Sequence, residues 1–554
     1  KVQATRADID QAAAYARDLR CYHRECWDRV VVPVLVPTRA KGYVRQESGV
    51  HIAGPDALDG LVAMLVGPTP SPAVDRERFL DEAAYCPLPT LVESARELFR
   101  TGDLREIKRA RAATDAAVDA ITLIIHHAAA TRTRHLVLLT GVPGSGKTLV
   151  GLRSVHAHYL DDLAVPRADG KPTAPAVFLS GNGPLVEVLQ YELSAAGGGG
   201  RTFVRGVKDY VKTYSSRPGL VPPQHVLVFD EAQRAFDRDM VAEKHKGQAG
   251  AEGGKSEPEH FVEFAERIPG WCVVIGLIGS GQEIHVGEEA GLVQWRWAVE
   301  RSGQPQSWTV HAPLAVANEF DGSSVAFALD PHLNLDTELR FHQASDLHRF
   351  VAALLEAKTV SLLRPIADQL EAAGFHLRLT RSLEEAKGYL KERYAEDPDA
   401  RYGLVASSKD RDLLGFGIPN DFQSTKRVRL GPWYGDSEAA YERRSCRHLE
   451  TCVTEFGAQG LELDATLLAW GTDLVMAGGE WSIARARGYR QSAKVRSAKQ
   501  LRLNSYRVLL TRGRDACVVF VPPLPELDET YGYLAGAGFT TLGDSTPVSE
   551  LGIL

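Results

Sequence analysis

Short apolar runs alternate along this chain with longer stretches of helical periodicity. Apolar runs typical of strands lie at 136–139, 176–180, 225–229 and 271–279, and a polar or glycine-containing turn follows each one. Helical periodicity covers the region from about 80 to 134. Because strands buried on both faces lack apolar/polar alternation, this order predicts an α/β fold with parallel sheets. Glycine-rich stretches at 195–202 and 246–260 predict surface loops.

Composition limits the class of protein. The 554 residues are enough for roughly three or four domains. With 44% hydrophobic and 24% charged residues, the chain has the composition of an ordinary soluble globular protein. Its formal net charge of −7 gives no long-range attraction to a polyanion, so a nucleic-acid site has to be a local basic surface.

The cysteines and the apolar stretches indicate the compartment. Seven cysteines occur without a CxxC pair, which favours reduced thiols over a zinc site. The longest apolar stretches are too short to span a bilayer, and no signal peptide precedes them. We therefore expect a cytoplasmic protein.

The strongest local motif is GVPGSGKT at 141–148, between an apolar run and a segment compatible with a helix. Its glycines let backbone N–H groups point into one concavity around phosphate groups, and the following helix N-terminus favours negative charge. In this motif Lys147 reaches the β- and γ-phosphates and Thr148 is a ligand for Mg²⁺. The alternative is a chance glycine turn. The candidate nucleotide-binding residues are Gly141, Gly144, Ser145, Gly146, Lys147 and Thr148.

An acidic pair follows the apolar run 225–229, about ninety residues after the glycine motif. In nucleotide hydrolysis Asp230 would hold Mg²⁺, and Glu231 would orient and deprotonate the attacking water. An exposed acidic pair at a strand end is common in isolation. Combined with the glycine motif, it predicts ATP hydrolysis.

Five further stretches contain candidate residues in an ordered series. Taken singly, each is explained equally well by a structural role, such as a turn or a helix start, and only their order favours function. They are Asn182 after a strand, Gln282 in GSGQEI, Arg340 ahead of an amphipathic helix, Thr454 and Glu462 in TEFGAQGLELD, and Arg512 in NSYRVLLTRGR.

The ordered set resembles superfamily 1 helicases, most closely the bacterial relatives of the Schlafen-type helicase domain, over roughly residues 85–523. The resemblance implies two RecA-like P-loop domains at 135–330 and 331–554, after a helical linker at 81–134, with ATP in the cleft between them. It implies Lys147, Thr148, Asp230, Glu231 and Gln282 from the first domain. It also implies Arg340 and Arg512 from the second as arginine fingers, which neutralise charge on the transferring phosphoryl group.

Two departures from that pattern affect mechanism and nucleotide choice. Ser280 and Gly281 stand where the superfamily usually has an acidic residue ahead of the glutamine, so coupling to DNA is expected to differ. No adenine-recognising glutamine is evident before the glycine motif, which leaves ATP against GTP open.

A basic segment predicts where a nucleic-acid backbone would bind. Ten basic residues and no acidic one lie between Arg485 and Arg514, which predicts a segregated positive surface. Trp271, Trp295 and Trp297 could stack on bases or, as is commoner for tryptophan, belong to the core. The backbone-tracking candidates are Arg485, Arg487, Arg490 and Lys494.

The first residues have a resemblance of their own. Gln11 and Tyr15 lie at i and i+4, on one helical face. RecB-like members of the PD-(D/E)xK nuclease fold have such a QxxxY helix, and the segment 28–38 would then form the next strand. On this resemblance residues 1–80 are part of a nuclease-like α/β domain, Lys1 is its catalytic lysine, and its acidic metal ligands lie upstream. The alternative is a plain amphipathic helix.

These observations favour an ATP-dependent translocase or helicase acting on single-stranded DNA, with RNA as the alternative, and using ATP and Mg²⁺. Two other functions compete: an ATP-gated nuclease, and a nucleic-acid-sensing ATPase switch that does not unwind. Fusions of this arrangement occur in bacterial defence against phage, which suggests that role by analogy alone.

Overall fold

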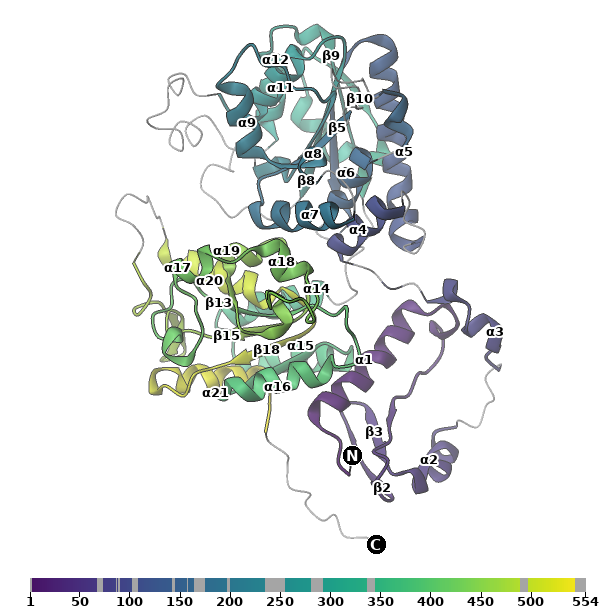
Figure 1. The fold of residues 1–554 in the computed structure, drawn as a ribbon, viewed down its shortest axis with the longest axis vertical. Coiled ribbons are helices and arrows are strands. Elements are labelled where there is room, and N and C mark those ends of the chain that lie inside the picture. Colours follow the sequence, from purple (N-terminus) through teal and green to yellow (C-terminus); the bar gives the residue numbers. More distant parts are fainter. Residues whose placement is uncertain are drawn as a thin grey trace. The chain divides into compact units, whose positions relative to one another are not determined.

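The computed structural model divides the chain into two compact units. Unit 1 comprises Lys1–Pro87 and Phe341–Leu554, and unit 2 comprises Leu88–Arg340 (Figure 1). Within the described parts of the chain, no helix has both the length and the apolar character needed to cross a membrane. The structure describes residues 2–66, 73–85, 87, 90–101, 108–141, 145–156, 158–163, 175–196, 200–234, 255–279, 292–335, 344–488 and 497–543.

Unit 2 is built on an eight-stranded parallel sheet in the order β10-β9-β4-β8-β7-β5-β6, with β11 also paired to β4. The predicted strands are present, and their apolar runs are buried on both faces. The strands are β4 (Arg134–Gly141), β5 (Ala176–Ser180), β6 (Val204–Gly206), β7 (Val226–Asp230), β8 (Cys272–Gly279), β9 (Trp308–Ala312), β10 (Ala326–Leu329) and β11 (Asn334–Leu335).

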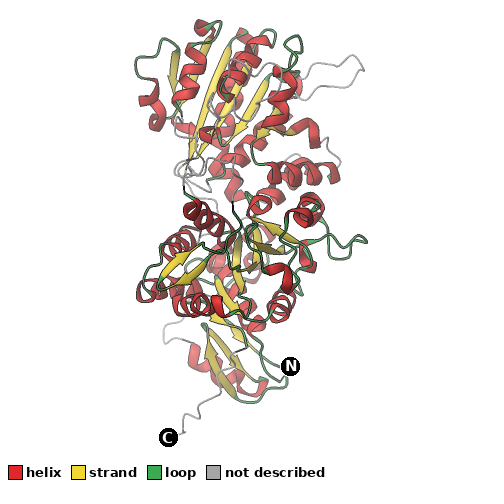
Figure 2. Cartoon of the chain, turned by 90° about the vertical axis from the view of Figure 1, so that its left-hand side faces the viewer, coloured by secondary structure: helices red, strands yellow, loops and turns green. Residues whose placement is uncertain are grey.

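Helices cover both faces of this sheet, as Figure 2 shows. Residues of α9, α11 and α12 share one apolar core with alternate strand residues such as Leu138 and Phe229. On α6, Gly151 lies so close to the sheet that a Cβ atom there would be 2.7 Å from Leu277 Cδ1. The helices are α4 (Leu91–Thr101), α5 (Lys108–Thr131), α6 (Lys147–His156), α7 (Gly183–Ala195), α8 (Gly200–Phe203), α9 (Val207–Ser215), α11 (Glu257–Arg267), α12 (Val293–Glu300) and α13 (Leu314–Ala317).

The predicted loops at 195–202 and 246–260 are wrong at their C-terminal ends. Helix α8 begins at Gly200, and α11 begins at Glu257. Ser256 caps α11: its side chain accepts from the backbone N–H of Glu259, and the Glu259 carboxylate accepts from the backbone N–H of Ser256 at 2.8 Å. This capping box satisfies two N–H groups at the helix start, and the Ser-x-x-Glu spacing was readable in the sequence.

Unit 1 contains a six-stranded parallel sheet in the order β14-β13-β15-β18-β12-β19. The carboxyl ends of five consecutive strands, from β14 to β12, lie in register, since Ala406 pairs with both Thr454 and Ala469, and Phe520 pairs with Ala469 and Thr380. The strands are β12 (His376–Thr380), β13 (Tyr402–Ala406), β14 (Cys452–Thr454), β15 (Leu463–Ala469), β18 (Gly513–Phe520) and β19 (Thr540–Thr541).

Helices surround the unit 1 sheet, and a short hairpin of β16 (Val475–Ala477) and β17 (Glu480–Ser482) contacts α21. With two parallel sheets flanked by helices, the predicted α/β fold of RecA-like domains is confirmed. The helices are α14 (Ala344–Leu355), α15 (Val360–Ala372), α16 (Leu383–Arg393), α17 (Phe422–Lys426), α18 (Leu430–Gly435), α19 (Glu455–Ala458), α20 (Ala498–Leu510) and α21 (Asp528–Ala537).

The N-terminal part of unit 1 contains a three-stranded sheet and three described helices, the longest of which is α1. Helix α1 packs on α16, and its residues Ile9 and Ala13 pack on Val50 and Ile52. The strand predicted at 28–38 is only two residues long. The elements are α1 (Arg6–Tyr22), β1 (Val34–Leu35), β2 (Tyr43–Glu47), β3 (Val50–Ala53), α2 (Leu58–Leu65) and α3 (Arg76–Phe79), and the sheet order is β1-β3-β2.

Candidate nucleotide site and nucleic-acid interface

The glycine motif lies between the end of β4 and the start of α6, as predicted. A side chain at Gly141 would put a Cβ atom 2.4 Å from Ser145 Oγ and 2.7 Å from the Leu335 carbonyl oxygen, so only glycine fits. Gly146 has φ of 89°, a backbone conformation that glycine adopts without strain. The Ser145 hydroxyl is buried and has no hydrogen-bond partner among the residues that the structure describes. A buried polar group left unpaired is costly, so this loop fits a polar ligand such as phosphate.

The two residues that follow the loop are the start of α6. Lys147 Nζ donates to the Gly141 carbonyl oxygen at 2.7 Å, across the mouth of the loop. The Thr148 hydroxyl donates to Asp230 Oδ1 at 3.3 Å. The structure thus brings Thr148 and Asp230 together, although they are 82 positions apart in the sequence. Hydroxyl and carboxylate oxygens are the ligands that Mg²⁺ prefers, so this pair fits the metal.

Asp230 is the last residue of β7 and is buried. Ser180 donates to its second carboxylate oxygen at 3.1 Å. Burial, followed by the neighbouring Glu231 carboxylate, raises the pKa of Asp230 to about 7. A divalent cation at this position favours the ionised form, since it opposes both causes.

Glu231 has a left-handed backbone, with φ of 57°. Such a conformation costs a non-glycine residue roughly 1–3 kcal/mol and is concentrated at functional sites. Gln233 supports it from η5 (Ala232–Arg234): its side-chain amide donates to Glu231 Oε2, and its oxygen accepts from the Gly279 backbone N–H at 2.8 Å. Sequence reasoning missed Gln233, although it lies only two residues after Glu231 of the predicted acidic pair.

Asn182 begins α7 at the carboxyl end of β5. Its side-chain oxygen accepts from the Leu185 backbone N–H at 3.4 Å, so it caps the helix. Its own backbone N–H donates to Ser180 Oγ at 3.1 Å, and Ser180 in turn donates to Asp230. The turn predicted to meet nucleic acid is therefore hydrogen-bonded to the acidic pair. Capping explains Asn182 without any ligand, and its contact with nucleic acid stays a prediction.

Several predicted site residues lie outside the described parts of the chain. The structure therefore leaves their roles as predictions. They are Lys1, Gly144, Gln282, Arg340, Arg490 and Lys494.

Arg512 follows α20 and precedes β18, as the sequence predicted. Its guanidinium donates to the carbonyl oxygens of Val508 at 3.0 Å and Leu461 at 3.3 Å. These bonds orient the guanidinium of Arg512. Thr454, at the end of β14, is buried and precedes α19.

The basic segment is not a uniform positive surface. Arg502 is only 2% exposed and forms ion pairs with Glu455 at 2.9 Å and Asp473 at 3.1 Å. The prediction was wrong for Arg502 because carboxylates from other parts of the chain neutralise it. Arg485 is exposed and pairs with Glu526 at 2.8 Å.

The three tryptophans have different surroundings. Trp295 is fully buried in the unit 2 core, where its ring N–H donates to the Ala232 carbonyl oxygen at 2.9 Å. The Trp271 ring stacks on His225, and the exposed Trp297 lies under the Arg301 guanidinium. Trp295 is therefore a core residue.

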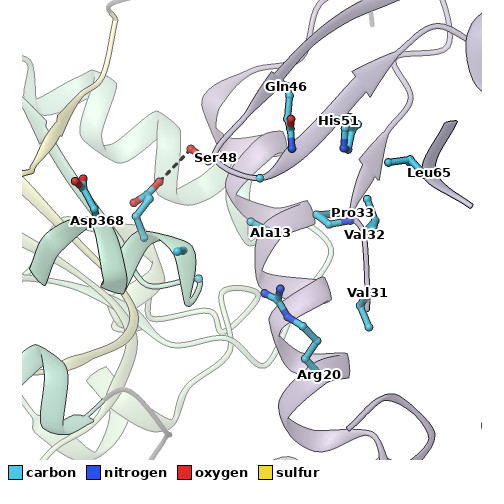
Figure 3. A pocket seen from close by; sticks show the side chains of 14 residues that line it. Ala13, Arg20, Val31, Val32, Pro33, Gln46, Ser48, His51, Leu65 and Asp368 are labelled. Atoms are coloured by element: carbon cyan, nitrogen blue, oxygen red, sulfur yellow. Dashed lines mark hydrogen bonds between the residues drawn. The ribbon is translucent and has the colours of Figure 1, made fainter. Parts of the chain in front are cut away.

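The predicted Gln11–Tyr15 pair forms: Gln11 Nε2 donates to the Tyr15 hydroxyl at 3.0 Å on the exposed side of α1. A pocket of about 440 Å³ borders another face of the same helix, which contributes Ala13 and Arg20 (Figure 3). Gln11 and Tyr15 are not among its lining residues. The structure thus separates the pair from the pocket and leaves a nuclease role untested.

The helix α1 also contributes to a buried charge cluster. Asp10, Glu371 and His376 are close enough to share a cation, the one such group among the described residues. The Arg378 guanidinium already lies there, 2.6 Å from Asp10 Oδ1 and 2.7 Å from Glu371 Oε1. Arginine therefore takes the place of a metal, and the cluster joins α1 to β12.

Comparison with known proteins identifies the family. No curated protein sequence matches the chain. The solved structure of the PRRSV helicase is similar at 13% identity and a TM-score of 0.25, covering 72% of this chain and 54% of that one, so this chain spans about half its length. The helicase domain of Pyrococcus furiosus Hef is similar at 11% identity and a TM-score of 0.24, covering 75% and 97%. Residues 134–523 match the Schlafen group 3 DNA/RNA helicase domain, and the chain belongs to this family.

Proposed function

We propose that this protein is an ATP-dependent helicase or translocase that moves along single-stranded nucleic acid. The observation that carries the proposal is the geometry at the carboxyl edge of the unit 2 sheet. There Lys147 donates to the Gly141 carbonyl oxygen, Thr148 donates to Asp230, and Gln233 holds Glu231. This arrangement lies inside a segment that belongs to a helicase domain family. Ligands of open α/β sheets bind at this edge.

Each residue has a proposed part in hydrolysis. The loop N–H groups and Lys147 bind the phosphates, where Lys147 exchanges the Gly141 carbonyl oxygen for phosphate oxygens. Thr148 and Asp230 would hold Mg²⁺, which neutralises charge on the phosphates when bound. Glu231 accepts the proton of the attacking water. Gln233 keeps Glu231 in place through the bridge to Gly279.

The remaining assignments are finer. Gln282 would sense the γ-phosphate, and Arg340 and Arg512 would be arginine fingers, an effect worth about 10³–10⁵ in rate where it is best characterised. Asn182, Thr454, Arg485, Arg487, Arg490 and Lys494 would contact the nucleic-acid backbone, with single-stranded DNA as the first candidate. The assignment to superfamily 1 and a role in anti-phage defence complete the proposal, the latter by analogy of fold alone.

The test is an ATPase and unwinding assay of the purified protein with Mg²⁺, run with single-stranded DNA, with single-stranded RNA and with neither. We expect turnover to rise with one or both nucleic acids and a partial duplex to be unwound. One unchanged rate in all three conditions would rule out a translocase. Stimulation without unwinding would favour the ATPase switch, and strand cleavage would favour the ATP-gated nuclease.

A further inference from the structure

Arg502 joins the segments that follow three neighbouring strands of the unit 1 sheet. It lies in the second turn of α20 and is buried. Its Nη2 atom donates to Glu455, directly after β14, at 2.9 Å. Its Nη1 atom donates to Asp473, four residues after β15, at 3.1 Å, and to Ser407, directly after β13. One guanidinium thus holds together the carboxyl edge of β14, β13 and β15.

The partners of Arg502 are themselves bound to that edge. Glu455 accepts from the Ser408 backbone N–H at 2.8 Å and from the Ser408 hydroxyl at 2.9 Å. Asp473 accepts from the Tyr506 hydroxyl at 2.7 Å, one turn along α20 from Arg502. Charged hydrogen bonds in a buried setting are stronger and more directional than those at a surface. The strand ends and the start of α20 therefore move together.

The other end of α20 lies at the opposite edge of the sheet. Arg512 precedes β18, and its carbonyl oxygen accepts from Leu463, the first residue of β15, at 2.9 Å. Its guanidinium donates to the Leu461 carbonyl oxygen at 3.3 Å. From Arg502 to the end of α20 at Leu510 the helix rises by about 12 Å, and Arg512 follows two residues later. The segment 455–461 also runs from the carboxyl edge to the amino edge of this sheet, and its helix α19 contacts α20.

Two parallel connections thus cross the sheet and are joined at both ends, by the Arg502–Glu455 ion pair and by the Arg512–Leu461 hydrogen bond. We propose that Arg502 is a positioning residue that couples nucleic acid bound at the carboxyl edge of the unit 1 sheet to the orientation of Arg512 at the amino edge. The inference rests on the proposed function, in which Thr454 contacts the nucleic-acid backbone and Arg512 is an arginine finger. Its physical basis is the unbroken series of contacts between the two residues.

The test uses R502K and E455Q in the full chain. R502K keeps a positive charge between the two carboxylates and loses the fork that binds both, whereas E455Q removes one partner's charge. The matched control is R447M, which also removes a buried arginine of unit 1 but one that binds Glu438 and the carbonyl oxygens of Asp397 and Ala400. Thermal melting followed by circular dichroism identifies the folded variants.

The first measurement is ATP turnover without nucleic acid and with saturating oligo(dT) or oligo(U). The second is the affinity of the protein for the same oligonucleotide, with and without a non-hydrolysable ATP analogue. In R502K and E455Q we expect turnover without nucleic acid to stay at the wild-type value and stimulation to fall by about tenfold, within the range found for coupling networks. Coupling between two binding sites acts equally in both directions, so the ATP analogue should change the affinity of these variants for the oligonucleotide less than it does in the wild type. R447M is expected to keep both effects.

The outcomes distinguish a coupling role of Arg502 from a purely structural one. Folded R502K and E455Q proteins with wild-type stimulation would overturn the coupling and leave the helicase proposal standing. An equal loss of basal and stimulated turnover, shared by R447M, would show that Arg502 is structural only and would also overturn it. A wild-type protein that nucleic acid does not stimulate would overturn the proposed function and the coupling together.

Discussion

Gln233 connects Glu231 to the end of the neighbouring strand β8, because its amide donates to the Glu231 carboxylate while its oxygen accepts from the Gly279 N–H at 2.8 Å. We expect Q233L to lower kcat by about 100-fold, since a small displacement of a catalytic group costs that much. ATP affinity, measured by fluorescence titration, should not change. Q224L removes another buried glutamine of unit 2, bound to the Tyr210 hydroxyl, and should keep wild-type turnover. A wild-type kcat in Q233L would show that the bridge does not position Glu231.

Lys147 is expected to be indispensable for nucleotide turnover. K147A removes the ammonium group that donates to the Gly141 carbonyl oxygen at the candidate phosphate-binding loop, so we expect both phosphate binding and charge neutralisation to be lost. ATP hydrolysis should fall to background in a phosphate-release assay. K208A, at an exposed position of α9, is the control. Measurable turnover in K147A would mean that another cation binds the phosphates.

Glu231 should separate binding from hydrolysis. E231Q keeps the size and polarity of the side chain and removes the proton acceptor, which typically costs about 10²–10⁴ in rate. ATP should therefore still bind, as measured by equilibrium dialysis, while hydrolysis stops. Loss of ATP binding in E231Q would contradict the role of a general base.

Asp10 is expected to be a stability residue of unit 1. It is buried, Arg378 donates to it at 2.6 and 2.7 Å, and Tyr389 donates to it as well. D10N leaves the Arg378 charge with less compensation, which should lower the free energy of unfolding by about 3–5 kcal/mol. Urea unfolding measures it, with D59N at an exposed position of α2 as the control. The D10N/R378M double variant should recover part of the loss, and an unstable D59N would argue against a specific role for Asp10.

A histidine pair should make unit 2 less stable at acidic pH. His135 Nδ1 and His311 Nε2 are 2.8 Å apart, and burial lowers the pKa of both, that of His135 to about 4. Between about pH 6.5 and 4, His135 is protonated in the unfolded state but stays neutral in the folded state. The free energy of unfolding therefore falls as pH falls. We expect a loss on the order of 2–3 kcal/mol over this range. H135Q should show a smaller slope in melting experiments, and an identical slope would refute this.

The arrangement of the candidate nucleotide site was predictable because its parts are local. A strand, a glycine loop and a helix follow one another, so Lys147 and Thr148 could be placed from sequence alone, and the end of an apolar run located Asp230. Gln233 was not predictable in the same way. Its role depends on a backbone N–H 46 positions away, which no local pattern specifies.

In the basic segment the sequence predicted an exposed positive surface that the structure does not show at Arg502. Thirty residues without a carboxylate suggest an exposed positive surface, yet Arg502 points inward to Glu455 and Asp473, which lie 47 and 29 positions earlier in the chain. Segregation of charge along a sequence therefore does not establish segregation in space. The same applies to Asp10, whose partner Arg378 is 368 positions away.

That last separation has a consequence for the synthesis of the protein. Unit 2 is one continuous segment inserted between the two parts of unit 1, so a ribosome releases it before the second part, Phe341–Leu554, exists. Until then α1 lacks Arg378 and exposes the buried carboxylate of Asp10 to water. Domains generally fold as units in the order in which they emerge. Helix α1 is therefore made long before its partner Arg378 and reaches its final place only after unit 2 has been synthesised.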